Sequence, residues 1–260
     1  MDPPDVPGST VAESVPSASR TPLRWLNVVL DLNGILCVCE ERKYSPRGLT
    51  FLTESDPHSS TVPAAIGPKA LYVRPMCAQF LSELSEIADI SVWSSMKRET
   101  TIQICRYLFK DTIMPVHVLG QEDCDRIKVL RNKRLSFMKV PGTNKDVFLK
   151  TLKKHLYNNF NGRFKADNTI IVDDSAIKHV LNKPANVVLL DSWSYKGEGS
   201  SDSFLMEKLL SWISRLYYSR DQGIKSFRKS DELGGTMMCD DPFSVEYNDI
   251  IAAIEQSEKM

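Results

Sequence analysis

Hydrophobic positions in the middle of the chain form two alternating patterns: short continuous apolar runs, and segments where apolar residues recur every three or four positions. The first pattern is typical of strands buried in a parallel sheet, and the second of amphipathic helices. The predicted strands are 26–30, 90–93, 116–119, 169–172 and 186–190. The predicted helices are 75–88, 97–109, 145–158 and 203–218. Because helices separate the strands, we expect an α/β fold, a Rossmann-like parallel sheet with helices on both faces.

Two long polar insertions interrupt this alternation, at 38–70 after the first strand and at 120–144 before the segment that holds the candidate lysines. Loops of this length are usually functional lids or disordered segments. We expect one domain over 23–218. Residues 1–22 are rich in Pro, Ser and acidic residues and are expected to be disordered. Residues 219–260 are expected to form an acidic, weakly structured tail.

The first predicted strand ends in a carboxylate. Asp31 follows the apolar run 26–30, and Asn33 and Gly34 come directly after it. Functional groups in open α/β sheets lie just beyond the carboxyl ends of the strands, so Asp31 is placed like an active-site residue. Asn33 stands where a second carboxylate would complete a catalytic pair. Whether the chain is an enzyme therefore depends largely on Asn33.

Further polar residues come at the carboxyl ends of other strands or near the start of a later helix. Ser94 ends the second strand, Lys145 and Lys150 lie near the start of the helix predicted at 145–158, and Asp173 and Asp174 follow the fourth strand. Each feature alone is a weak signal, because Ser and Asp often cap helices. Together and in this order they are much more specific. The four histidines form no motif and are interpreted as loop, packing or surface residues.

Taken in order, these motifs resemble those of the haloacid-dehalogenase-like phosphatases. The resemblance is to the branch that dephosphorylates the C-terminal domain of RNA polymerase II, also called NLI-interacting-factor-like. The branch's first motif, Asp-Leu-Asp-x-Thr-Leu, stands at 31–36 as Asp-Leu-Asn-Gly-Ile-Leu. Its Arg-Pro helix start, its Phe-Thr-Ala-Ser strand end and its Leu-Asp-Asp-Ser motif match 74–81, 93–96 and 172–175. The resemblance covers roughly 24–218.

The resemblance implies a Mg²⁺ site built from carboxylates. Asp31 and Asp174 would supply carboxylate ligands, and Asp173 would act directly or through a neighbouring ligand. The backbone carbonyl of Asn33 would contribute as well, a role that the change of side chain leaves intact. Mg²⁺ prefers one or two carboxylates, waters and substrate oxygens, which agrees with this set.

The resemblance also implies phosphoryl transfer through an aspartyl-phosphate on Asp31. A lysine would neutralise charge on the transferring group, and Ser94 would bind a phosphate oxygen. The motif lysine is closest to Lys150, in Lys-Thr-Leu, with Lys145, in Lys-Asp-Val, as a rival.

Asn33 puts turnover in question, because in these phosphatases the second Asp is the general acid and base. Asn has no proton to exchange near neutral pH, and loss of such a group typically costs about 10²–10⁴ in rate. One hypothesis is therefore a slow or specialised Mg²⁺-dependent phosphatase of phosphoserine proteins. A second is a module that binds phosphopeptides or proteins, as in the mitochondrial inner-membrane translocase receptor of the same domain family. A third is another phosphotransfer enzyme on this scaffold.

The formal net charge is zero, with 33 basic and 33 acidic residues, but the charges are unevenly placed. Ten basic residues and one acid lie between Arg126 and Lys154, while eight acids and one lysine lie in 231–260. The basic segment is either a solvated face or a positive lobe for a phosphorylated protein or peptide. Nucleic acid is disfavoured as a partner, because a surface that binds single strands has many aromatic residues among its basic ones. This segment has only two, Phe137 and Phe148.

Neither the cysteine spacing nor the hydropathy indicates a metal-binding or membrane-spanning protein. Six cysteines are scattered without a C-x-x-C pair, which is typical of packing rather than metal binding. No apolar run approaches the roughly 18 residues of a membrane span. We therefore expect a nuclear or cytoplasmic location, or a mitochondrial one if the translocase-like hypothesis holds. The sequence leaves the oligomeric state open.

Overall fold

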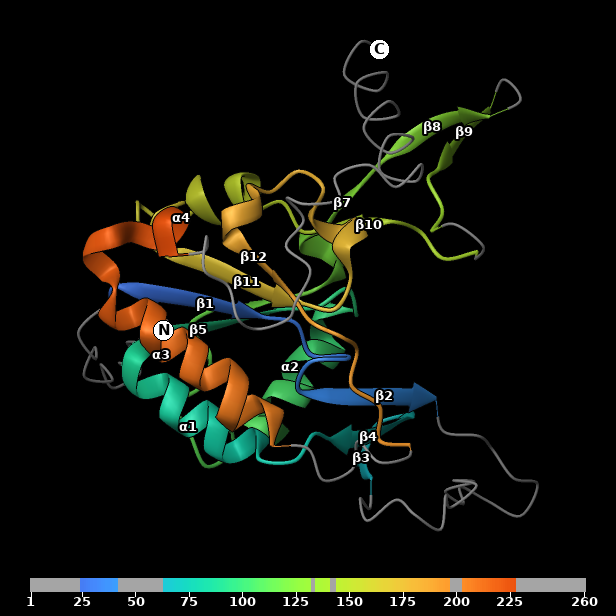
Figure 1. The fold of residues 1–260 in the computed structure, drawn as a ribbon. Coiled ribbons are helices and arrows are strands. Elements are labelled where there is room, and N and C mark those ends of the chain that lie inside the picture. Colours follow the sequence, from blue (N-terminus) through green and yellow to red (C-terminus); the bar gives the residue numbers. More distant parts are fainter. Residues whose placement is uncertain (1–23, 42–62, 132–133, 141–143, 197–202, 228–260) are drawn as a thin grey trace, which may run out of the picture.

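The computed structural model describes residues 24–41, 63–131, 134–140, 144–196 and 203–227, and their centre is a five-stranded parallel sheet (Figure 1). The strand order is β12-β11-β1-β5-β6, and every neighbouring pair is parallel. These strands are β1 (Leu26–Leu30), β5 (Ala88–Trp93), β6 (Val118–Leu119), β11 (Thr169–Asp173) and β12 (Val187–Leu189). All five agree with the predicted apolar runs, because continuous burial leaves no polar face on a central strand.

Helices cover both faces of the sheet, as predicted. One face packs against α1 (Cys77–Ile87), α2 (Arg98–Leu108) and a π-helical segment η6 (Leu205–Leu210) that continues as α3 (Ser211–Tyr218). The other face packs against the π-helical turn η2 (Lys153–Tyr157). Side chains of β1 alternate between the two cores: Val28 and Leu30 lie in the first and Val29 in the second. The predicted fold class is thereby confirmed.

The helix predicted at 145–158 is wrong over its first half. Residues Phe148–Leu149 form the short strand β10, which pairs antiparallel with β7 (Asp125–Arg126). The backbone N–H of Lys150 then donates to the carbonyl of Lys178, 2.8 Å away. These contacts to other parts of the chain replace the local hydrogen bonds of a helix, so helical backbone begins only at Lys153.

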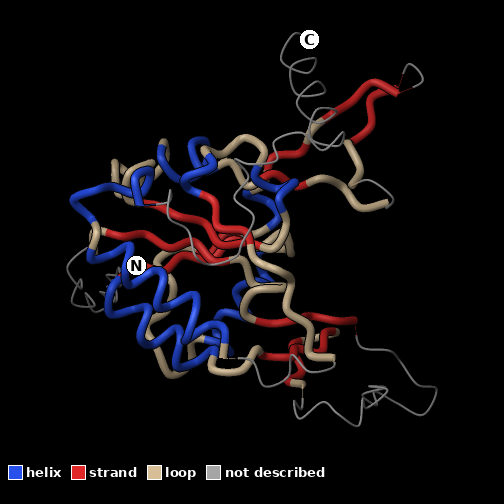
Figure 2. The backbone as a smooth tube through the Cα atoms, viewed as in Figure 1, coloured by secondary structure: helices blue, strands red, loops and turns tan. Residues whose placement is uncertain are grey.

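Both polar insertions contain regular structure where the chain is described. The first contributes the antiparallel sheet of β2 (Cys37–Glu41), β4 (Lys69–Val73) and β3 (Ala64–Ile66), while 42–62 lie outside the described residues. The second contributes β7 and the hairpin of β8 (Lys128–Arg131) and β9 (Arg134–Phe137). Strands β1 and β11 run toward the side of the molecule where both insertions lie (Figures 1 and 2). The insertions therefore flank the carboxyl edge of the sheet.

The remaining short elements are 3₁₀ turns and one terminal helix: η1 (Gln121–Asp123), η3 (Ala176–His179), η4 (Pro184–Asn186), η7 (Arg220–Gln222) and α4 (Gly223–Phe227). The last of these extends the packed chain past the expected boundary at 218. Ile224 is buried in the main core, and Phe227 meets the ring of Trp212 edge to face at 5.6 Å. The predictions for 1–22 and 228–260 concern segments outside the described residues. Among the described helices, none has the length and apolar character to cross a membrane.

We predict that Ile224→Ala lowers the free energy of unfolding by about 2–5 kcal/mol, because it empties a buried site in the main core. Ile224 is 1% exposed, whereas Ile113 is 55% exposed and provides a matched control. Urea denaturation measures both variants, and Ile113→Ala should stay within about 0.5 kcal/mol of wild type. Equal effects of the two substitutions would show that α4 does not belong to the cooperative core.

Candidate active site

A tight turn after β1 holds Asp31 at the carboxyl edge of the sheet. The Leu32 carbonyl accepts the N–H groups of Leu36 and Cys37 at 2.9 and 3.0 Å, and Oδ1 of Asp31 accepts the N–H of Leu32 at 2.8 Å. Asp31 is almost completely buried. Its carboxylate is therefore oriented by the backbone of its own turn.

Gly34 allows the Asp174 carboxylate to approach this turn. The φ angle of Gly34 is +86°, a conformation that side chains rarely adopt. A Cβ atom there would lie 2.1 Å from Oδ2 of Asp174 and 2.6 Å from Oγ of Ser192. Only glycine leaves room for the carboxylate, so the first motif and the paired aspartates come together at residue 34.

Asp173 is the buried centre of the charge network. Its Oδ2 lies 2.5 Å from Nζ of Lys150 and 3.1 Å from Nε2 of His179. Its Oδ1 accepts the N–H of Ser175 and the ammonium of Lys178, both at 2.9 Å. A carboxylate has about four lone-pair positions, and Lys150, Ser175 and Lys178 use three of them. Asp173 thus holds the surrounding cations in place.

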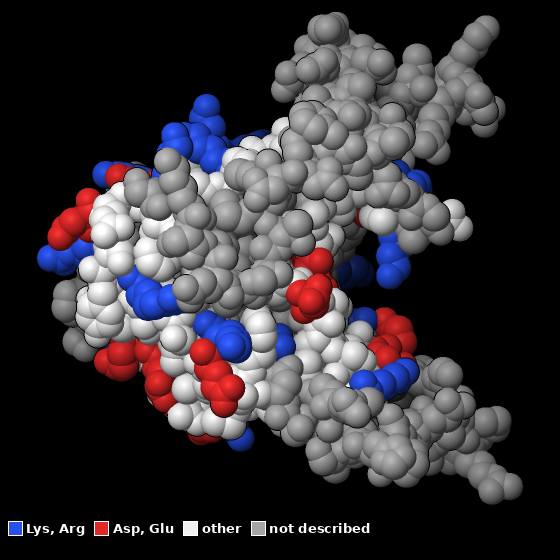
Figure 3. Space-filling view, in the orientation of Figure 1, with Lys and Arg blue, Asp and Glu red and all other residues white. Residues whose placement is uncertain are grey.

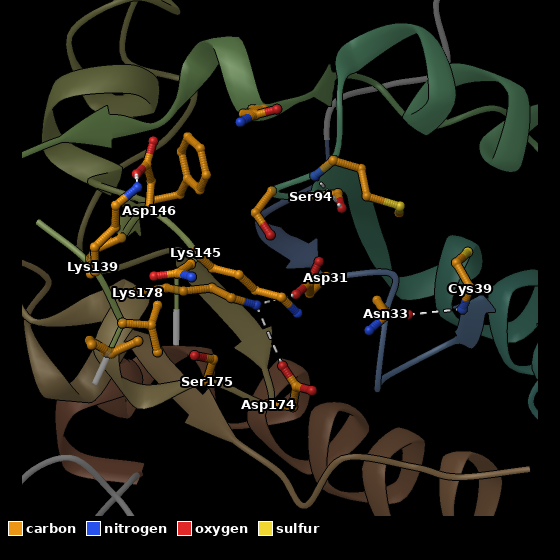
Figure 4. A pocket seen from close by; sticks show the side chains of 18 of the residues that line it. Asp31, Asn33, Cys39, Ser94, Lys139, Lys145, Asp146, Asp174, Ser175 and Lys178 are labelled. Carbon is orange, nitrogen blue, oxygen red and sulfur yellow. Dashed lines mark hydrogen bonds and ion pairs between the residues drawn. The ribbon is translucent and has the colours of Figure 1, made fainter. Parts of the chain in front are cut away.

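Lys178 lies between the carboxylates at the mouth of the site (Figure 4). Its ammonium is 2.8 Å from Oδ2 of Asp31, 2.9 Å from Oδ1 of Asp173 and 3.5 Å from Oδ1 of Asp174. One oxygen from each of these aspartates lies within 4.8 Å of the others. Lys178 therefore contacts every carboxylate of the cluster.

Of the two candidate lysines, Lys150 is the one whose contact with Asp31 the structure describes. Its Nζ is 3.1 Å from Oδ2 of Asp31, and its side chain is 0% exposed. Asn182 fixes the local backbone: its Nδ2 donates to the carbonyl of Lys150 at 2.7 Å and its Oδ1 accepts the N–H of Leu152 at 2.8 Å. Lys145 instead lines the cleft above the site.

Ser94 and Asn33 both border the same cleft. Ser94 ends β5, and its hydroxyl accepts the N–H of Met96 at 3.2 Å. Asn33 is exposed, and its side-chain oxygen accepts the N–H of Cys39 at 2.9 Å (Figure 4). The residue that stands in place of a general acid is thus tethered to the middle of β2.

The cleft above these residues has a volume of about 670 Å³ and is rich in lysine. Its lysines are Lys69, Lys139, Lys145 and Lys178. Figure 3 shows a hollow on the side of the insertions, with Lys and Arg side chains above and below it. Part of the basic segment is neutralised, because Arg126 and Lys139 both pair with Asp146. Three carboxylates, Asp31, Asp146 and Asp174, line the same cleft, so its four lysines outnumber its carboxylates by one.

One short turn connects the cleft wall to the charge network. Ile177 of η3 and Val180, directly after it, share a hydrophobic cluster with Ile127, Met138 and Val140 of the second insertion, while Lys178 and His179 contact the aspartates. The turn therefore presents an apolar side to the insertion and a polar side to the site.

The network also sets the charge states of its members. Burial alone would raise the pKa of Asp173, but Lys150, His179 and Lys178 outweigh burial and hold that pKa well below its usual value. Burial lowers the pKa of His179, so the ring is neutral, with Nε2–H suited to donate to Asp173 and Nδ1 to accept from Asn182. Burial raises the pKa of Asp174. The three aspartates outweigh burial at Lys178 and raise its pKa, so Lys178 is charged.

The donor set suits Mg²⁺ in its chemistry, because hard divalent cations bind oxygen ligands. Asp31 and Asp174 offer carboxylate oxygens at the cleft, whereas Asp173 already accepts three hydrogen bonds and lies 3.1 Å from Nε2 of His179. The ammonium of Lys178 contacts the same oxygens. The residues therefore fit the ion, provided that Lys178 moves aside.

The structure brings together most of the predicted site residues and adds two that sequence reasoning missed. Asp31, Lys150, Asp173 and Asp174 meet in one network, and Ser94 and Asn33 border it. Lys178 and His179 were overlooked. The spacing of Lys178 could have revealed it, because a lysine four residues after Asp174 returns to the strand end on one helical turn.

In a comparison with known protein families, residues 26–222 match the family described as NLI interacting factor-like phosphatase. Similar solved structures include a variant of the fission yeast RNA polymerase II CTD phosphatase Fcp1 bound to beryllium fluoride. The match to it has 13% sequence identity and a TM-score of 0.40, and it covers 78% of this chain and 53% of that chain. Another is Fcp1, an essential RNA polymerase II CTD phosphatase, with 14% identity and a TM-score of 0.41 over 80% and 54%. The chain thus spans about half the length of these structures. No curated protein sequence matches it significantly.

We predict that Lys150→Met lowers the free energy of unfolding by about 3–5 kcal/mol, because it leaves the buried Asp173 without its closest cation. Adding Asp173→Asn should recover part of this loss, since the double variant no longer buries the unpaired charge. Urea denaturation gives both values, and Lys153→Met, at an exposed lysine three residues on, is the matched control. If Lys150→Met and Lys153→Met had equal effects, the network would not stabilise the fold.

Proposed function

Because the chain belongs to the NLI interacting factor-like phosphatase family, we propose that it is a slow Mg²⁺-dependent phosphatase of phosphoserine-bearing protein segments, acting through Asp31. The observation that carries this proposal is the position of Asp31 at the cleft, with one oxygen 3.1 Å from the ammonium of the buried Lys150. The backbone of the turn orients the other oxygen. Asp31 is thus an oriented carboxylate beside the fixed cation Lys150.

Charge explains why this cation matters. A phosphate monoester is an anion, so it repels the carboxylate that attacks it. Ammonium groups beside the nucleophile reduce this repulsion and stabilise the charge on the transferring group. Lys150 is held in the network by Asp173, so it serves this role without rearrangement. The hydroxyl of Ser94 would bind an oxygen of the phosphate.

The metal would be held by Asp31 and Asp174, with the backbone carbonyl of Asn33 as a further oxygen ligand. When bound, Mg²⁺ would supply additional positive charge next to the transferring phosphoryl group. Asp173 would keep Lys150 in place rather than bind the ion, because it already accepts three hydrogen bonds.

Turnover would take two steps at phosphorus. In the first, an oxygen of Asp31 forms a bond to phosphorus while the ester P–O bond breaks, and the serine oxygen leaves with the electron pair and takes a proton from water. In the second, the oxygen of a water molecule bonds to phosphorus while the bond between phosphorus and the Asp31 oxygen breaks. This releases inorganic phosphate and restores the Asp31 carboxylate, and a proton of the attacking water neutralises the hydroxide left by the first step. Asn33 can carry a proton in neither step, so both are slow.

Substrate choice would follow from the cleft. Its lysines favour an anionic group, and its volume of about 670 Å³ leaves room for residues around a phosphoserine. Leaving groups that need no proton, such as aryl oxides, would suffer least from Asn33. We therefore propose that aryl phosphates are hydrolysed faster than phosphoserine peptides.

A second candidate function is phosphopeptide or protein binding without turnover. The observation that favours it is the tethered amide of Asn33 together with Lys178, which already pairs with Asp31. A phosphorylated ligand could then occupy the lysine-lined cleft without being cleaved. The retained Asp31 favours catalysis, since a binder has no need of a nucleophile.

We predict that Asn33→Asp raises the turnover of a phosphoserine peptide by about 10²–10⁴, the usual contribution of a general acid and base. A carboxylate oxygen can accept the Cys39 N–H as the amide oxygen does, so the turn should be preserved. Phosphate release with Mg²⁺ present measures the rate. Turnover of an aryl phosphate should rise much less.

Asp31→Asn is the control, alone and combined with Asn33→Asp, and it should abolish activity in both backgrounds. Activity that persists without Asp31 would reject the proposed nucleophile. If Asn33→Asp and the wild type both lacked activity, and the wild type bound the phosphopeptide, the binding function would be the correct one.

A further inference from the structure

We propose that Lys178 is a tethered cation that occupies the carboxylate cluster when no divalent ion is bound and competes with such an ion for the same oxygens. This inference deepens the proposed function, because it concerns the metal that the same site would use. Its basis is that one ammonium contacts all three aspartates, at 2.8, 2.9 and 3.5 Å. A lysine ammonium has three donors, one for each carboxylate.

The charges explain why some cation has to be present. Three carboxylates with oxygens within 4.8 Å of one another repel strongly in a buried site. Lys150 alone would leave two net negative charges, whereas Lys150 and Lys178 together leave one. Lys178 therefore assembles the cluster in the absence of metal.

Lys178 and a divalent ion cannot share the cluster. Both would need the oxygens of Asp31 and Asp174, and the positive charges would repel each other at contact distance. The ion can therefore bind only if the ammonium withdraws.

The surroundings of the two lysines show which one can withdraw. Lys150 is 0% exposed, and the backbone on either side of it is held by Asn182 and by the carbonyl of Lys178. The Lys178 side chain is 17% exposed and lines the cleft, which has room for its flexible stem. Lys178 is thus the mobile cation and Lys150 the fixed one.

Mn²⁺ binding tests the inference without substrate. We expect Lys178→Met to bind Mn²⁺ more tightly than the wild type by roughly 5- to 150-fold, the usual range for coupled binding equilibria, as measured by electron paramagnetic resonance titration. Lys69→Met is the matched control, because Lys69 lines the same cleft with the same charge but pairs with Glu41. Lys69→Met should change the affinity much less.

Thermal unfolding gives a second readout. Mg²⁺ should raise the melting temperature of Lys178→Met more than that of the wild type, since an ion that binds the folded state more tightly stabilises it more. Lys178→Gln, which keeps hydrogen-bond donors, replaces the Met variant if the latter does not fold. Three results would overturn the inference. The wild type and the Lys178 variants could bind Mn²⁺ equally tightly, Lys69→Met could gain as much Mn²⁺ affinity as Lys178→Met, or none of the proteins could bind Mn²⁺. A chain without phosphatase activity could still show the competition, so the two proposals fail separately.

Discussion

Electrostatic repulsion among two buried aspartates and one half-buried aspartate is the constraint on which the carboxyl edge of the sheet depends. Asp31, Asp173 and Asp174 can share this edge only because Lys150 and Lys178 neutralise most of their charge. The supporting parts follow from this need. Asn182 fixes the backbone around Lys150, and the missing side chain of Gly34 admits Asp174. Removing either lysine would leave the three aspartates with more uncompensated negative charge.

The sequence predicts the sheet well because burial alone determines its pattern. The run Leu26–Leu30 has no polar side to present, so its place as a central strand follows directly. The polar residues at strand ends were also predictable, since parallel strands bring their carboxyl ends to one edge. The helix predicted at 145–158 fails because Lys150 takes its backbone partner from a distant turn. Periodicity records local preference, and it carries no information about such partners.

Lys178 shows the other limit of sequence reasoning. Its importance depends on a 3₁₀ turn that carries it back over the strand end, and the spacing of Lys178 from Asp174 is the one sequence signal of this return. Asn33 is the reverse case: its position was plain from the motif, but its contact with Cys39 appears only in three dimensions. Position along a strand is therefore easier to predict than the direction of a side chain.

The turn Ala176–His179 gives the site a mechanical property as well as an electrostatic one. Ile177 and Val180 are wedged against the second insertion, while Lys178 reaches the aspartates. One turn therefore links the insertion to the ammonium beside Asp31. A macromolecule that displaced the insertion would therefore also displace the positive charge next to Asp31. Binding of a partner at the insertion, far from the phosphate, would then be coupled to the position of the Lys178 ammonium beside Asp31.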